Sequence, residues 1–365
     1  MFTADPGTVE PLQSYLRTLG VKLEVVSDNL QAMVDKERSE IAASPGYVKG
    51  RLDTYDLGVY HDLSEMYAYI EDLTASDFVR EYAGLFSVGE SFEGRQLRVL
   101  KIGKPRPDGQ PKPAFWWDCG IHAREWISPT SCMYASHQLI VNYAEGNEAY
   151  RDLVEDIDWY ILPSLNPDGY EYSWEEERFW RKTRSGPFEG GCFGVDLNRN
   201  WDARWGDPGS SPNPCSETYH GPFVFSESEA RAVARFLTAQ GDRMKAYVNM
   251  HSYGLLWLIP YSYEPNLYPD DIDEIRELSQ RVTNAIEQVH GTVYEIGTSA
   301  DILYAVSGGV TDWAKEKALI KWTFTPELRG PGFDPPMSEI LPNSEEIWSG
   351  MQVIARQVIA DSGDE

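Results

Sequence analysis

The chain has 365 residues, of which 42% are hydrophobic and 25% are charged, and these proportions are ordinary for a globular protein. Its formal net charge of −26 argues against nucleic acid as a partner, because binding phosphates requires a basic surface. The same charge predicts a monomer whose copies repel one another. No apolar run is long enough to span a membrane, and residues 1–10 show no signal peptide.

The first fifty residues differ from the rest of the chain. Residues 21–26 alternate apolar and polar side chains, as a short strand does. Ser27 then caps a predicted helix that ends at residues 44–46. The apolar side of this helix is formed by Leu30, Met33, Val34 and Ile41. So short a segment does not fold well alone, so we predict an appendage over residues 1–50 and a single domain over residues 51–365.

From residue 51 onward, helices and strands alternate. Asp62 and Glu65 form a capping-box pair at the start of a helix. Further helices are predicted over residues 128–143, 229–237, 271–289 and 344–359. Strands are predicted over residues 96–102, 114–117, 158–162, 246–250, 292–296 and 320–324. This alternation predicts an α/β fold, with a mixed, mostly parallel twisted sheet that is covered by helices on both faces.

One of the six histidines stands in a context that suggests chemistry. His122 follows a predicted strand that ends near Gly120, and Glu125 comes three residues later. The loop at the carboxyl end of such a strand is where open α/β sheets hold their sites. One imidazole and one carboxylate at this spacing provide two ligands for a tetrahedral zinc site.

Two further candidate residues each lie at the end of a predicted apolar strand. His251 is the candidate third ligand, whereas His61 and His290 lie beside or inside helices and are less well placed. Two histidines and one glutamate leave one coordination position open, as a catalytic zinc requires. Glu327 ends another strand, where its carboxylate is suited to accept a proton from an attacking water; the alternative is an ordinary surface glutamate.

Six motifs together resemble the pancreatic-type zinc metallocarboxypeptidases, the A/B group, over nearly the whole chain. The motifs are Gly120-Ile121-His122-Ala123-Arg124-Glu125-Trp126, Arg178-Phe179-Trp180-Arg181-Lys182-Thr183-Arg184, Val195-Asp196-Leu197-Asn198-Arg199-Asn200-Trp201, His251-Ser252-Tyr253, Tyr304-Ala305-Val306-Ser307-Gly308-Gly309 and Pro326-Glu327-Leu328-Arg329. They occur in the order of the family and near its spacings. The resemblance implies the carboxypeptidase fold and hydrolysis of the C-terminal peptide bond, with one zinc ion per chain.

By this resemblance, zinc is bound by His122, Glu125 and His251. Glu327 becomes the general base and acid. Arg181 stabilises the oxyanion of the tetrahedral intermediate, where a fixed positive charge is most effective.

The resemblance also implies how the substrate is held. Its free C-terminal carboxylate is bound by Asn198, Arg199 and Tyr304, because an arginine fork grips a carboxylate with two hydrogen bonds. Arg124 lines the next subsite. Arg178 has either a binding role or a structural one.

The four cysteines allow three pairings, and their spacing alone does not choose between these pairings and free thiols. In the family that the chain resembles, the equivalents of Cys192 and Cys215 form a disulfide, and in several members so do those of Cys119 and Cys132. Both bridges are therefore expected, and with them an oxidising, extracellular location.

The resemblance places Thr311 at the floor of the pocket for the C-terminal side chain. B-type enzymes have an aspartate there and A-type enzymes an aliphatic residue, so Thr311 departs from both patterns. The wall positions are Leu258, Val306, Val310 and Thr325. This uncharged pocket favours aliphatic or aromatic C-terminal residues, since Lys or Arg would lose solvation without gaining a counter-ion.

Residues 1–50 resemble the last part of the family's activation segment. Lys49 and Arg51 are then candidate cleavage sites for an activating trypsin-like protease, although an ordinary charged loop has the same composition. Three alternatives stay open at this point. They are a B-like enzyme that removes Lys and Arg, an inactive relative that binds peptide C-termini, and a zinc-free α/β interaction protein.

Overall fold

The computed structural model describes residues 6–20, 27 and 29–363 and divides into two units, Met1–Ala43 and Ser44–Glu365. The first unit contains α1 (Pro6–Thr18) and α2 (Leu30–Ala43). The predicted helix after Ser27 is therefore present, but the Ala32 amide donates to Asn29 Oδ1 at 3.0 Å, so Asn29 caps it. The strand predicted over residues 21–26 lies outside the described residues. The domain boundary predicted at residue 50 stays a prediction.

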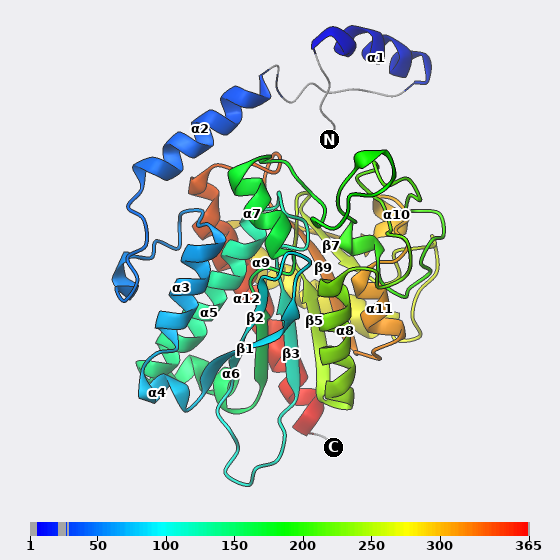
Figure 1. The fold of residues 1–365 in the computed structure, drawn as a ribbon. Coiled ribbons are helices and arrows are strands. Elements are labelled where there is room, and N and C mark those ends of the chain that lie inside the picture. The colour runs from blue at the N-terminus through cyan, green and yellow to red at the C-terminus, as the bar shows by residue number, and fades with distance from the viewer. Residues whose placement is uncertain (1–5, 21–26, 28, 364–365) are drawn as a thin grey trace. The chain divides into compact units, whose positions relative to one another are not determined.

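The second unit is built on one nine-stranded sheet (Figure 1). In chain order its strands are β1 (Ala83–Glu90), β2 (Gln96–Ile102), β3 (Ala114–Asp118), β4 (Asp158–Leu162), β5 (Met244–Asn249), β6 (His251–Ser252), β7 (Leu256–Ile259), β8 (Glu295–Thr298) and β9 (Trp322–Leu328). Their spatial order is β1-β2-β4-β3-β5-β9-β7-β8, and β6 also pairs with β9. The predicted α/β fold with a mixed, mostly parallel sheet is confirmed.

The centre of the sheet is parallel; β2 pairs antiparallel with β1 and β4, and β7 pairs antiparallel with β9 but parallel with β8. β3 pairs in parallel with β4 and β5, and β5 pairs in parallel with β9. All five residues of β3 and of β4 are buried, as expected for parallel strands that are covered on both faces. The parallel strands therefore present their carboxyl ends at one common edge.

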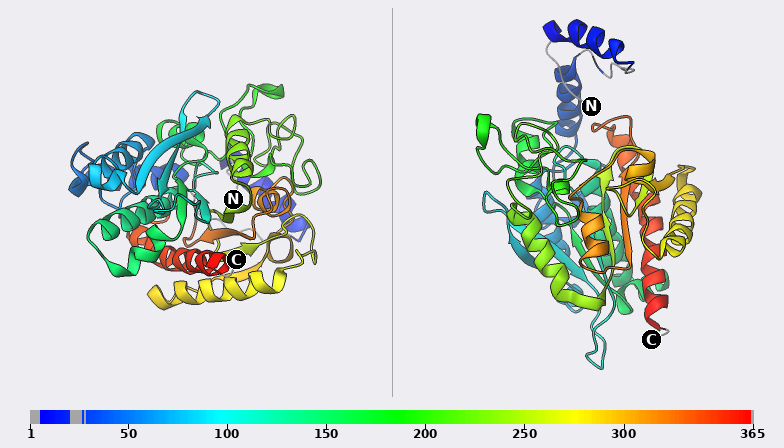
Figure 2. Two further views of the ribbon diagram at one scale, coloured as in Figure 1. Left: turned by 90° about the horizontal axis from the view of Figure 1, so that it is seen from below. Right: turned by 90° about the vertical axis from the view of Figure 1, so that its right-hand side faces the viewer.

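Helices cover both faces of the sheet. In this unit they are α3 (Leu63–Leu73), α4 (Asp77–Arg80), α5 (Ile127–Ala144), α6 (Arg151–Glu155), α7 (Pro167–Glu175), α8 (Ser228–Gln240), α9 (Ile272–His290), α10 (Ser299–Ile302), α11 (Val310–Glu316) and α12 (Ile340–Gly363). Figure 2 shows α9 and α12 side by side on one face and α8 on the other. A buried core joins α8 and α11 to the sheet through Val233, Trp313 and Trp116.

The predicted cap of α3 is present, in a modified form. Asp62 Oδ1 accepts a hydrogen bond from the Glu65 amide at 2.8 Å. The Glu65 carboxylate does not return to the helix start; it contacts His61 Nδ1 at 2.7 Å and accepts from the Tyr47 amide at 3.1 Å. Among the described residues, no helix combines the length and apolar character needed to cross a membrane.

Candidate active site

Three predicted site residues come from segments that meet at the carboxyl edge of the parallel strands. His122 follows β3, His251 begins β6, and Glu327 lies near the end of β9. The turn after β3 requires Gly120, whose φ is +64° and where a Cβ would lie 3.3 Å from Pro129. The sheet thus brings together residues that are up to 205 positions apart in the sequence.

His122, Glu125 and His251 form a compact, buried cluster in which potential ligand atoms all lie within 4.8 Å of one another. His122 Nδ1 is 2.8 Å from Glu125 Oε1, and His251 Nδ1 is 3.2 Å from Glu125 Oε2. The two Nδ1 atoms are 3.1 Å apart. Both imidazoles therefore direct the same nitrogen toward the carboxylate.

The far nitrogen of each imidazole is held by an oxygen. His122 Nε2 lies 3.0 Å from Asp196 Oδ1, and His251 Nε2 lies 2.5 Å from Asn249 Oδ1. Protonated Nε2 atoms donate to these oxygens, and each Nδ1 then keeps its lone pair for a metal. Two neutral imidazoles and one carboxylate in this arrangement fit zinc and leave a coordination position open for chemistry.

Asn249 is itself oriented by a buried carboxylate. Its Nδ2 donates to Asp118 Oδ1, which leaves the Asn249 Oδ1 to face His251. Trp116 and Tyr247 donate to the other Asp118 oxygen, each at 2.7 Å. Burial raises the pKa of Asp118 to about 6, although these three donors oppose the increase. Sequence reasoning missed Asp118 and Asn249; their only signal was their place beside the strand ends that carry His122 and His251.

Asp196 connects the metal cluster to the neighbouring arginines. It accepts from Arg181 Nη2 at 2.9 Å and Arg181 Nε at 3.1 Å, and it lies 3.7 Å from Arg199 Nη1. Burial alone would raise the pKa of Asp196, but Arg181, Arg199 and His122 hold it well below its ordinary value. This carboxylate was within a quoted motif but was not assigned a role from the sequence.

Glu327 lies beside the metal cluster in a partly buried position. In the register of the sheet it is the partner of His251 on β6. Burial raises the pKa of its carboxyl to about 7, with the charge of Glu125 adding to the increase and His251 opposing it. A carboxyl with this pKa can take up and release a proton near neutral pH.

The other polar residues of the predicted clamp lie close by. Arg199 is buried and donates through Nε to the Gly209 carbonyl at 2.8 Å. Asn198 Oδ1 accepts from the Val310 amide at 3.0 Å. Tyr304 is 55% exposed, yet its side chain is near enough to act on the pKa values of Arg199 and Arg181.

The two remaining predicted arginines differ in their surroundings. Arg124 pairs with Glu217 at 3.1 Å and stacks over the Phe333 ring at 4.2 Å. Arg178 stacks on Trp126 at 3.6 Å and donates to the Arg124 and Phe333 carbonyls. The two hydrogen bonds of Arg178 to main-chain oxygens fit a structural role.

The residues assigned to the specificity pocket are mostly buried and uncharged. Thr311 and Thr325 are joined by a hydrogen bond of 2.5 Å between their hydroxyl oxygens. Leu258, Val306 and Val310 are buried. The neighbouring Asp312 is also buried, and both of its carboxylate oxygens contact the Ser262 amide, at 3.0 and 2.9 Å.

Both expected disulfides are present. Cys119 is bonded to Cys132, and Cys192 to Cys215. The first bridge ties the segment that leads to His122 to helix α5, so it supports the loop that carries two of the metal ligands.

Comparison with known proteins identifies the family. The zinc carboxypeptidase family model matches residues 66–350. Carboxypeptidase A2 of Mus musculus is 37% identical over 357 residues, which cover 96% of this chain and 82% of that protein. Carboxypeptidase B of Astacus astacus is 41% identical over 303 residues, which cover 82% of this chain and 97% of that protein.

Solved structures agree with this assignment. The crystal structure of the carboxypeptidase A from Helicoverpa armigera superposes with a TM-score of 0.88 at 29% identity, covering 98% of this chain and 88% of that one. The family match and the buried His122–Glu125–His251 triad together show that the cofactor is zinc and that the substrates are peptide C-termini. The chain belongs to the zinc carboxypeptidase family and is a zinc metallocarboxypeptidase of the A/B group.

Proposed function

We propose that this carboxypeptidase prefers aliphatic and aromatic C-terminal residues. The observation that carries the proposal is the bond between Thr311 and Thr325 in a pocket whose other assigned residues are apolar. One hydroxyl donates to the other, and neither offers a negative charge. A Lys or Arg side chain would lose its hydration there without gaining a counter-ion.

The buried carboxylate next to Thr311 in the sequence does not change this expectation. Asp312 contacts the Ser262 amide through both oxygens, so these oxygens are already engaged. Burial raises the pKa of Asp312 to about 7, so a large fraction of it is neutral near neutral pH. A partly neutral carboxyl is a poor partner for a cationic substrate.

In the catalytic step that we propose, Glu327 moves the proton. Zinc, when bound to the triad, supplies a Lewis acid that polarises a carbonyl and makes water more acidic. Glu327 accepts a proton from the attacking water and passes it to the leaving amine, for which its pKa of about 7 is well suited.

Arg181 stabilises the negative charge that develops on the carbonyl oxygen. Asp196 holds its guanidinium with two hydrogen bonds, so little reorganisation is needed when the charge appears. Arg199, Asn198 and Tyr304 bind the free C-terminal carboxylate of the substrate, which an internal peptide bond lacks. Arg124 contacts the residue before the cleaved bond.

A B-like preference for C-terminal Lys and Arg is the second candidate. It is favoured by the identity of 41% with the Astacus astacus carboxypeptidase B and by the net charge of −26. The overall charge raises the local concentration of cationic peptides but does not provide a counter-ion in the pocket.

The proposal also includes the activation, the location and the oligomeric state of the enzyme. Residues 1–50 are a partial activation segment and residues 51–365 the catalytic domain, with cleavage by a trypsin-like protease after Lys49 or Arg51. Two disulfides favour an extracellular location, and the strong negative charge favours a monomer.

Hydrolysis of blocked dipeptides tests the proposal. Substrates ending in Phe, Leu, Lys or Glu are compared before and after limited trypsin digestion, with a chelator control and with each C-terminus amidated. Release of Phe and Leu that is lost on amidation supports the pocket and the carboxylate clamp together. Faster release of Lys would overturn the A-like preference while leaving the family assignment intact.

A further inference from the structure

A second pocket lies at the edge of the sheet opposite the zinc site. It has a volume of about 220 Å³ and is formed at the amino ends of the parallel strands. Asp158 is the first residue of β4, Lys112 precedes β3, and Arg243 precedes β5. The rest of its lining comes from the end of β2 and the connection from β2 to β3, a loop at the lower end of the sheet in Figure 1.

The charge of this pocket is opposite to that of the whole chain. Its lining contains four cationic side chains, Lys101, Arg106, Lys112 and Arg243, and one carboxylate, Asp158. The chain itself carries a formal net charge of −26. An excess of three positive charges in one concave site of so acidic a protein needs a physical explanation.

Only part of the positive charge in the pocket is needed to neutralise the buried Asp158 carboxylate. Lys112 Nζ lies 3.1 Å and Lys101 Nζ 3.3 Å from the Asp158 carboxylate, and Arg243 Nη2 also donates to it. Lys112 further donates to the Val154 and Ile157 carbonyls, at 2.9 and 2.8 Å. Lys112 therefore uses two of its donors on main-chain oxygens, and its single charge is enough to balance that of Asp158.

The other three cations keep donors for a ligand. Lys101 makes one ion pair, and its side chain is 38% exposed. Arg243 engages three of its five donors, with Asp158, the Lys112 carbonyl and Gln240. The Arg106 guanidinium makes no hydrogen bond or ion pair with any residue that the structure describes, and the side chain is only partly exposed.

The electrostatics agree with this geometry. Burial lowers the pKa of Lys112 to about 8, and the neighbouring Lys101 lowers it further, although Asp158 and Asp156 oppose the decrease. Asp158 acts on Lys112 more strongly than Lys101 does, so Lys112 is matched to Asp158, and the positive charge open to an anion is that of Lys101, Arg106 and Arg243.

We propose that this basic pocket binds a tetrahedral oxyanion, a phosphate or sulfate group, through Lys101, Arg106 and Arg243. Two arginine forks and an ammonium match the oxygens of such a group, and charge-assisted hydrogen bonds of this kind are the strong ones. The volume lies below that of pockets for drug-sized ligands, so a small ion or the end group of a larger molecule fits best.

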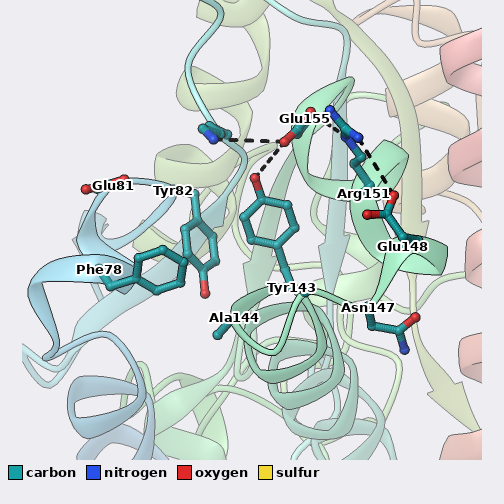
Figure 3. A pocket seen from close by; sticks show the side chains of 11 residues that line it. Phe78, Glu81, Tyr82, Tyr143, Ala144, Asn147, Glu148, Arg151 and Glu155 are labelled. Carbon is teal, nitrogen blue, oxygen red and sulfur yellow. Dashed lines mark hydrogen bonds and ion pairs between the residues drawn. The ribbon is translucent and has the colours of Figure 1, made fainter.

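A neighbouring pocket shows what a balanced surface site looks like in the same protein. It has a volume of about 280 Å³ and is drawn in Figure 3. Its two cations are already paired with its own carboxylates: Lys104 with Glu155 at 3.9 Å, and Arg151 with Glu155 at 3.2 Å and with Glu148 at 3.7 Å. No comparable pairing exists in the basic pocket for Arg106 among the described residues.

The test is a thermal-unfolding titration of the zinc-loaded full chain with inorganic sulfate and with inorganic phosphate, at constant ionic strength set by chloride. A specific site gives a saturable rise in Tm, whereas the general salting-out effect of these anions rises without saturation. Arg106→Ser removes one charged donor and should raise the half-saturating concentration about ten-fold. The charge-matched control Lys317→Ser changes an exposed lysine after α11 and should leave it unchanged.

The arginines of the active site offer a second place for an anion, so the titration is repeated on Arg199→Ala. The proposal is supported, for the anion that gives the effect, if two results hold. Arg199→Ala keeps the saturable rise in Tm, and Arg106→Ser needs a higher anion concentration to reach half-saturation. A phase that persists in Arg106→Ser or disappears in Arg199→Ala overturns the proposal, and so does the absence of a saturable phase with both anions.

Discussion

His251 and Glu327 are paired in the register of β6 and β9, so a zinc ligand and the proposed base are placed by main-chain pairing of two parallel strands. Their relative position therefore does not depend on the conformation of a flexible loop. Because β9 also pairs with β5, the strand that precedes His251, the same sheet sets the distance from the base to the metal.

Replacing Glu327 by Gln keeps the shape of the side chain and removes the base. We expect kcat to fall about a thousand-fold, with zinc content and Tm close to those of the unmodified enzyme. Hydrolysis of a blocked dipeptide ending in Phe, measured together with metal analysis, checks this. Glu295→Gln, on an exposed position of β8, is the matched control. Nearly full activity of the Glu327 variant would show that another group moves the proton.

Asn249→Ala tests the hydrogen bond that fixes the tautomer of His251. Without the acceptor at 2.5 Å, Nε2 is no longer held in its protonated form, and Nδ1 is less often free to bind. We expect zinc affinity to fall roughly ten- to a hundred-fold, measured by competition with a chelator.

The activity of the Asn249→Ala variant at saturating zinc separates positioning from catalysis. We expect kcat to recover largely once zinc is in excess, because Asn249 acts through His251. Asn284→Ala, on an exposed position of α9, is the control for a general loss of stability. Unchanged zinc affinity would remove Asn249 from the metal site.

The parts of the fold that were predictable are those with strong, uninterrupted patterns. The strands predicted over residues 96–102 and 158–162 occur with the same bounds, because their runs of apolar residues are bordered by clear turns. In contrast, β1 was not predicted, since Gly84 and Gly89 interrupt its pattern and its edge position exposes several of its side chains. β7 has only four residues, too few to show a period.

The residues of the active site also include some that the sequence pattern predicts and some that it does not. The three metal ligands were predictable because each residue ends or follows a predicted strand. Parallel strands place their carboxyl ends at one edge of the sheet, so these residues were expected to lie together. Asp196 and Asn249 could not be given roles, because their function depends on which nitrogen of each imidazole they face. That orientation is set by side-chain packing in the folded site, and no residue spacing in the sequence indicates it.

Thr311→Asp tests the floor of the specificity pocket. A carboxylate there supplies the counter-ion that the native pocket lacks, so we expect the ratio of kcat/KM for Lys-ending to Phe-ending substrates to rise roughly ten-fold or more. Thr311→Asn is the control, since it adds similar bulk without charge. If both variants show the native preference, Thr311 does not contact the substrate's C-terminal side chain.

Asp312 makes the stability of the enzyme depend on pH in a direction opposite to that of ordinary carboxylates. Burial raises its pKa from 3.8 to about 7 in the folded protein, and the charge of Glu316 adds to the increase. The folded state therefore binds the proton more tightly than the unfolded state. The free energy of unfolding should decrease as the pH rises from about 4 to about 7, because ionisation of a buried group disfavours folding.

Asp312→Asn removes this contribution while keeping an oxygen for the Ser262 amide. The stability of the variant relative to the unmodified enzyme should grow across that pH window, by an amount on the order of 4 kcal/mol for a shift of this size. Denaturant unfolding at a series of pH values measures the difference in free energy of unfolding between the variant and the unmodified enzyme. The pH-dependent contribution of the zinc ligands is the same in both proteins and cancels. Asp273→Asn, an exposed change on α9, should give a difference that is constant with pH. A constant difference for Asp312→Asn as well would mean that its carboxyl titrates at an ordinary pKa and is a full negative charge beside the specificity pocket.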